Sequence, residues 1–264
     1  MRSRLFAVFT AAALAMAPLQ ASADPAPVTG VEINHPLSQA VAVKATFDFN
    51  DGRVGFDAAR QLRGEMWDIN PLWNGQRLRE AASSHGLNTK QKYMDALIYD
   101  AGLSKIAVQR AVEASKKFEH ARTANNYCQL GAPSACRAEA TATINGRGGW
   151  GNNLAAGYGS MRATVLDGWG HGELAALNAA NGRFNGANGH LYQLLNPDNR
   201  YMGFGFVSVP GSTYGTAAAS TFANGPTTVT SAPAGRQTVY LYRAAEGAER
   251  PTGIVGNRIP LIRF

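Results

Sequence analysis

The chain has 264 residues and a formal net charge of +7, from 25 Lys and Arg against 18 Asp and Glu. Its hydrophobic content of 45% is ordinary for a globular protein, and its length suits one domain with extensions or two small domains. The basic residues form no cluster long enough for a nucleic-acid surface, so we expect no nucleic-acid partner.

Residues 1–23 have the parts of a secretory signal peptide. Arg2 and Arg4 form a basic start, Leu5 to Met16 is almost wholly apolar, and Ala21-Ser22-Ala23 matches the small-x-small cleavage pattern. The apolar run is too short to span a bilayer, and no other long apolar run follows. We therefore expect a secreted protein, extracellular or in the cell envelope, with no transmembrane segment in the mature chain.

Residues 24–64 are predicted to form an N-terminal extension. Apolar residues alternate from Val41 to Phe49, which indicates a strand. The pair Asp51-Gly52 that follows is typical of a turn.

Three helices are predicted next. Asn70 is a suitable N-cap with Pro71 at the first helical position, so the first helix runs to about Ser84. The second fits Thr89 to Asp100. The third begins at Ser104, and its apolar side consists of Val108, Ala111, Val112, Ala114 and Phe118.

The second half of the chain mixes helices with strands. After a Gly-rich loop at residues 146–151, helices are predicted to begin at Ser160 and to cover Glu173 to Ala180 and Asn188 to Leu195. Strands are predicted over Tyr201 to Val209, Thr216 to Phe222 and Gln237 to Tyr242. Helices followed mostly by strands indicate an α+β or layered α-β-α domain. The last strand either joins this sheet or pairs with the strand at residues 41–49.

The chain has two cysteines, Cys128 and Cys136. In an exported protein, a pair this close in sequence is best interpreted as a disulfide. The alternative is two free thiols. A metal role has little support, since no His stands at zinc-finger spacing.

Four segments resemble, in order, the motifs of one family. Residues 118–122 (Phe-Glu-His-Ala-Arg) resemble a Phe-x-His-x-Arg segment, and residues 151–155 (Gly-Asn-Asn-Leu-Ala) a Gly-Glu-Asn-x-Ala loop. Trp169 with Glu173 resembles a Trp-x-x-Glu helix, and residues 189–195 a Gly-His-x-x-x-Leu-Leu segment. The family is the CAP superfamily, the SCP-like extracellular domain of cysteine-rich secretory proteins, antigen 5 and plant pathogenesis-related proteins.

The resemblance covers about residues 65–225, which we expect to form a CAP-like domain. Residues 226–264 would then be a C-terminal extension with one added strand. The fold that the resemblance implies is a three-layer α-β-α sandwich with a central antiparallel sheet.

In that family, two His and two Glu face one another in a central cavity. The matching positions here are His120, His190, Glu173 and Asn152. Asn152 thus stands where relatives have Glu, and the spacing from Trp169 to Glu173 is one residue longer than usual.

Two imidazoles and a carboxylate can hold a divalent metal, Zn²⁺ or Mg²⁺, in an open site. Only the resemblance brings His120 and His190 together; alone, each is equally typical of an ordinary packed histidine. Because Asn152 removes one negative charge, we expect weaker metal affinity than in relatives. Asn152 and Asn153 are expected beside the ligands, where an amide can orient a His. His171 is either a substitute ligand or a polar loop residue.

The sequence has no Gly-x-Ser-x-Gly and no His-Glu-x-x-His motif. The leading hypothesis is a secreted, non-catalytic CAP-domain protein that binds a lipid or small apolar ligand, a divalent metal, or a cell-envelope or host protein. The alternative is a metal-assisted hydrolase that uses His120, His190 and Glu173. A third hypothesis is a structural protein of the envelope.

Overall fold

The computed structural model describes residues 29–31, 40–120, 122, 142–233, 235–245 and 247–252. The expected signal peptide, residues 1–23, lies outside these ranges, as do Cys128 and Cys136 with their expected disulfide. Within the described ranges, no helix has both the length and the apolar character needed to cross a membrane.

One main sheet organises the fold. Its strands follow the order β10-β1-β8-β9-β7 with antiparallel neighbours, and β4 pairs in parallel with β8. Two small hairpins, β2–β3 and β5–β6, stand apart from it. The strands are β1 (Ala40–Asp48), β2 (Leu72–Trp73), β3 (Gln76–Arg77), β4 (Ile98–Tyr99), β5 (Thr143–Ile144), β6 (Arg147–Gly148), β7 (Gly151–Ala156), β8 (Tyr201–Ser208), β9 (Thr216–Ala223) and β10 (Arg236–Ala244).

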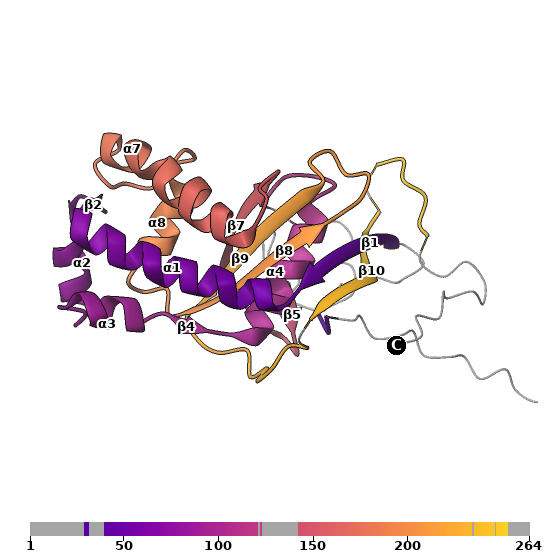
Figure 1. The fold of residues 1–264 in the computed structure, drawn as a ribbon, viewed down its shortest axis with the longest axis horizontal. Coiled ribbons are helices and arrows are strands. Elements are labelled where there is room, and N and C mark those ends of the chain that lie inside the picture. The colour runs from indigo at the N-terminus through magenta and orange to yellow at the C-terminus, as the bar shows by residue number, and fades with distance from the viewer. Residues whose placement is uncertain are drawn as a thin grey trace, which may run out of the picture.

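Helices accompany this sheet, so the α+β class predicted from the sequence is confirmed. Figure 1 shows β1 and β10 side by side at one end of the molecule, and α2, α3, α7 and α8 gathered towards the other end of α1. The helices are α1 (Asn50–Ile69), α2 (Leu78–Ser84), α3 (Lys90–Asp95), α4 (Ala101–Ala114), α6 (Met161–Ala163), the π-helical segment η2 (Thr164–His171), α7 (Gly172–Ala179) and α8 (Gly189–Leu195).

Strand β8 packs closely against two helices through alternate residues. A Cβ added to Gly55 of α1 would lie 2.6 Å from the Cβ of Phe204, so α1 rests directly on the Phe204 side chain. The neighbouring residues Gly203 and Gly205 instead face the backbone of α4, with which an added Cβ would collide. Since successive strand residues point to opposite faces, the two helices contact β8 from different sides.

The strand predictions are confirmed at both ends of the chain. The strand expected at residues 41–49 is β1, and the strand expected at residues 237–242 is β10. The two pair antiparallel along their whole length, from Ala40 opposite Ala244 to Asp48 opposite Arg236. This is one of the two pairings that the sequence left open. The residues assigned to an N-terminal extension thus contribute β1 and most of α1 to the described fold.

The turn predicted at Asp51-Gly52 is wrong, because both residues lie in the first turn of α1. An acidic residue there interacts favourably with the helix dipole, which suits Asp51. At Gly52, a Cβ would lie 2.8 Å from Ser104 Oγ, so close packing rather than a turn requires the glycine.

The helix predicted from Asn70 to Ser84 is only half right. Asn70 adopts a left-handed conformation and ends α1, and residues 72–77 form the β2–β3 hairpin. Asn74 and Gly75 both have positive φ, at 49° and 83°, as an Asn-Gly type I′ turn requires. Only residues 78–84 are helical, as α2.

Helix α4 differs from its prediction at both ends. Asp100, not Ser104, caps it, by accepting a hydrogen bond from Leu103 N. Ser104 Oγ instead accepts from Phe204 N of β8. The helix ends at Ala114, so Phe118, expected on its apolar side, lies beyond it and is exposed. The preceding helix α3 is also shorter than the predicted range of Thr89 to Asp100, and Thr89 is its N-cap.

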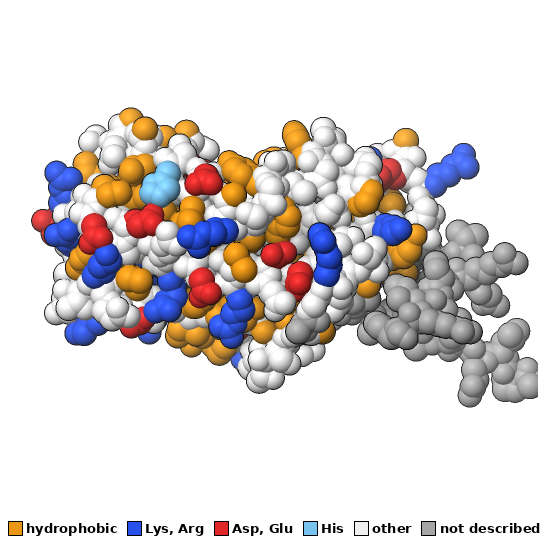
Figure 2. All heavy atoms as spheres, in the orientation of Figure 1, with side chains coloured by type: hydrophobic (Ala, Val, Ile, Leu, Met, Phe, Trp, Pro, Cys, Tyr) orange, Lys and Arg blue, Asp and Glu red, His pale blue; other side chains and the backbone are white. Residues whose placement is uncertain are grey.

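Charges are mixed on the face that carries α1. Figure 2 shows Lys and Arg side chains interspersed with Asp and Glu on this face. Helices α1 and α3 are joined there by the ion pairs Arg60–Asp95 and Lys90–Asp68.

Candidate functional site

Two histidines that are 70 residues apart in the sequence meet beside strand β7. The ring centres of His120 and His190 are 6.1 Å apart, and the ring planes are inclined by 34°. His120 follows the end of α4 and is exposed, whereas His190 is the second residue of α8 and its side chain is 24% exposed. The juxtaposition implied by the resemblance is therefore present in the structure.

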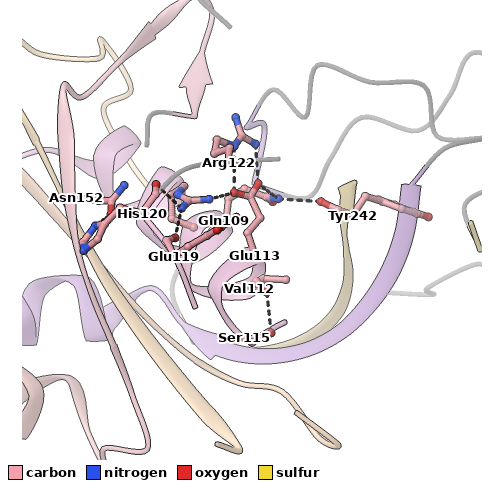
Figure 3. Close-up of polar contacts among 10 residues, drawn as sticks. Gln109, Val112, Glu113, Ser115, Glu119, His120, Arg122, Asn152 and Tyr242 are labelled. Carbon is pink, nitrogen blue, oxygen red and sulfur yellow. Dashed lines mark hydrogen bonds and ion pairs between the residues drawn. The ribbon is translucent and has the colours of Figure 1, made fainter. Parts of the chain in front are cut away.

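Strand β7 supports both histidines from the end of the strand order. Asn152 is buried, and its Oδ1 lies 2.9 Å from His120 Nδ1 (Figure 3). The next residue, Asn153, donates from Nδ2 to the backbone carbonyl of His190 at 3.2 Å. Adjacent strand residues point to opposite faces of a sheet. Asn152 and Asn153 therefore leave β7 on opposite sides, and each contacts a different histidine segment.

Glu173 binds the second histidine. Its Oε1 lies 2.5 Å from His190 Nδ1, and its Oε2 accepts a hydrogen bond from Leu191 N at 2.9 Å. Leu191 lies in the first turn of α8, where backbone N–H groups have no partner within the helix. The carboxylate therefore orients the imidazole and also caps the positive end of α8.

These contacts determine which ring nitrogen carries the hydrogen when each histidine is neutral. A carboxylate or amide oxygen can only accept, so Nδ1 of His120 and of His190 carries the hydrogen. The lone pair then resides on Nε2 of each ring. In the described part of the chain, neither Nε2 has a hydrogen-bond partner. The pair thus presents two basic nitrogens that can bind a metal or accept a proton.

Trp169 adds an apolar wall to the site, a role that the sequence analysis did not predict for it. Its ring centre is 5.7 Å from that of His190, and its Nε1 donates to the carbonyl of Leu154 in β7 at 3.3 Å. Trp169 is buried in segment η2. The signal in the sequence is its position just before Glu173.

The structure does not bring His171 to this pair. Its Nε2 lies 3.0 Å from Glu65 Oε2 on α1, and its side chain is 48% exposed. His171 is two residues from both Trp169 and Glu173, a spacing that places it on a different side of the helical segment.

A metal would find few charged ligands here. Among the described residues, no three His, Cys, Asp or Glu are arranged to hold a metal ion together. Glu173 uses both oxygens in hydrogen bonds, and Asn152 carries no charge. Within the described ranges, what remains for a metal is the pair of imidazoles.

A buried ionic cluster behind His120 is missing from the sequence predictions. Glu113 of α4 pairs with Arg110 and with Arg122, whose Nη2 lies 2.6 Å from Glu113 Oε1 (Figure 3). Burial alone would raise the pKa of Glu113, but the two guanidinium groups outweigh it and lower the pKa to about 2. The signal in the sequence is the pair Arg110 and Glu113, three residues apart in a mostly apolar helix.

Comparison of the chain with protein-family models, with curated proteins and with solved structures finds no match. The resemblance to the CAP superfamily therefore remains a prediction from the motifs. The function has to be inferred from the geometry of the site.

Proposed function

We propose that this is a secreted, CAP-like binding protein that takes a divalent metal ion of the Zn²⁺ type at His120 and His190. One observation carries the proposal: the two imidazole rings lie 6.1 Å apart between centres, and each has Nδ1 engaged while Nε2 has no hydrogen-bond partner among the described residues. Metal-binding histidines usually donate their other ring N–H to a carboxylate or carbonyl oxygen, which fixes the ring and increases its basicity. Glu173 and Asn152 are placed to do this for the two rings.

The separation of the two rings is slightly larger than one bound Zn²⁺ ion requires. A Zn–N bond of about 2.0–2.1 Å, added to roughly 1.1 Å from nitrogen to ring centre, places the centres of two coordinated imidazoles about 5.2 Å apart at a tetrahedral angle. From the observed 6.1 Å, the two rings would have to move about 1 Å closer to share the ion. With two neutral ligands and no coordinating carboxylate, we expect a weak site that leaves positions open for water or a small anionic ligand.

The fold proposed for this function is the three-layer α-β-α sandwich of the CAP superfamily. The central sheet with α1 and α4 packed against alternate residues of β8 supports it. The order of the motif-bearing segments around β7 supports it too. In chain order these segments are the end of α4, β7 itself, η2 with α7, and α8.

The decisive experiment is calorimetric titration of the mature protein with Zn²⁺. Wild type is compared with the His120→Ala/His190→Ala double variant and with His171→Ala, which removes an exposed histidine that also pairs with a glutamate. We expect stoichiometric binding in wild type and His171→Ala and its loss in the double variant. Absence of binding by folded wild type would refute the metal function and direct the search to apolar ligands or protein partners.

A metal-assisted hydrolase is the second candidate, and the Glu173–His190 contact favours it. An imidazole whose Nδ1–H is held by a carboxylate can accept a proton from water at Nε2 when no metal is bound to that nitrogen. With a metal held there, His120 and His190 would be ligands and the metal would supply the activation of water. A hydrolase of this design would lose nearly all activity with His120→Ala and little with Asn152→Glu. Screening of ester and peptide substrates with these two variants tests the candidate; equal activity in both would refute it.

A further inference from the structure

His120 needs support that its own segment does not supply. Helix α4 ends at Ala114, and residues 115–120 form turns and irregular backbone. His120 is exposed, so packing does not fix its ring. The contact with Asn152 has a defined geometry only if the backbone at His120 is held in place.

Arg110 holds this backbone from the interior. Its side chain is 1% exposed, and its Nη2 donates to the carbonyl of Glu119 at 3.2 Å and to that of His120 at 3.0 Å. A guanidinium group is planar and carries several donors in a fixed fork, so one side chain can bind two successive carbonyls. Figure 3 shows Glu119 and His120, whose carbonyls accept these bonds, beside Asn152.

Glu113 in turn holds Arg110. It binds Arg110 and Arg122 together, and it also accepts a hydrogen bond from Gln109 Nε2 at 3.0 Å. Gln109 Nε2 donates as well to the carbonyl of Tyr242 in β10 at 2.8 Å (Figure 3). A continuous set of polar contacts therefore runs from β10 through α4 to His120.

Stability alone gives little reason for such a cluster. Replacing buried ion pairs by packed apolar residues is often neutral or stabilising, because the charges must be removed from water. A buried pair can instead specify one arrangement of the chain. Here the arrangement specified is the path of residues 115–120.

We propose that Glu113 and Arg110 are positioning residues that fix His120 at Asn152 and thereby set the affinity of the site. The regulation of affinity rests on the proposed function, whereas the positioning of His120 does not. Glu113 neutralises the buried cations, and Arg110 anchors the carbonyls of Glu119 and His120.

The test measures the tautomer of His120 by ¹⁵N NMR in the metal-free full-length mature protein, and then Zn²⁺ affinity by calorimetry. Glu113→Gln removes the central charge without changing its shape. Asp100→Asn is the matched control, because Asp100 is also a buried acid on α4, but caps its opposite end. Arg110→Lys keeps a positive charge for Glu113 but lacks the fork that spans two carbonyls.

We expect His120 as a single Nδ1–H tautomer in wild type and in Asp100→Asn, and a mixture of tautomers in Glu113→Gln and Arg110→Lys. Zn²⁺ affinity should fall about tenfold or more in these two variants. An unchanged His120 signal in folded Glu113→Gln would overturn the proposal, as would an equal change in Asp100→Asn. If Glu113→Gln does not fold, Arg110→Lys decides by the same criteria. If wild type binds no Zn²⁺, only the proposed function fails, since the NMR signal needs no metal.

Discussion

Replacing Glu173 by Gln should weaken both the fold and the site. In wild type, the two carboxylate oxygens accept from His190 Nδ1 at 2.5 Å and from Leu191 N at 2.9 Å. Gln has a similar shape but only one accepting oxygen, so its NH₂ group must face one of the two donors. A half-buried donor without a partner costs about 1–3 kcal/mol, which corresponds to a fall in Tm of roughly 2–12 °C for a chain of this size.

The site should respond as well. If His190 Nδ1 loses its acceptor, the ring is free to carry its hydrogen on Nε2, which then cannot bind a metal. We expect Zn²⁺ affinity to fall about 10- to 100-fold, as for other residues that orient metal-bound histidines. Glu65→Gln is the matched control, because it alters the exposed His171–Glu65 pair and should change Tm and affinity little. Equal losses in the two variants, by differential scanning calorimetry and titration, would refute this reasoning.

Two further predictions concern stability. The pKa of Glu113 is lowered from 4.5 to about 2, so its stabilisation of the fold is complete above pH 4.5 and is lost as pH falls towards 2. Urea unfolding at pH 5, 4 and 3 should show that wild type loses about 2 kcal/mol more stability between pH 5 and pH 3 than Glu113→Gln does. Gly203→Ala should destabilise by about 1–3 kcal/mol or more, because its Cβ would collide with Ser104 N of α4. Gly225→Ala, with no atom within 4 Å of the new Cβ, should leave Tm nearly unchanged; a similar loss in both would contradict the packing argument.

Local sequence patterns predict the strands well and some helix ends poorly. Strands β1, β8 and β9 follow from residue patterns that need no knowledge of the rest of the chain. The wrong turn prediction at Asp51-Gly52 has a different origin. Gly52 is required by close packing against Ser104 of another helix, which the local sequence does not reveal. The hairpin at Asn74-Gly75 did carry a local signal, but the cap-like Asn70 competed with it.

The candidate site is less predictable than the fold. Nothing in the spacing of His120 and His190 says that they meet; motif resemblance alone suggested it. Asn152 can reach His120 because β7 lies at the end of the sheet and presents its side chain to the segment that leaves α4. The dependence of that segment on Arg110 involves contacts with backbone carbonyls, and these leave no pattern in the sequence.

The π-helical segment η2 offers a physical explanation for the spacing between Trp169 and Glu173, which is one residue longer than in the motif that this part of the sequence resembles. In the family that the sequence resembles, the Glu follows the Trp by three residues, and here it follows by four. In η2, Gly172 N bonds to Asp167 O five residues earlier, so this turn takes up one residue more than an α-helical turn. Residues four apart across such a turn point in nearly the direction that three-residue spacing gives in an α-helix. Trp169 and Glu173 therefore both contact His190 despite the extra residue.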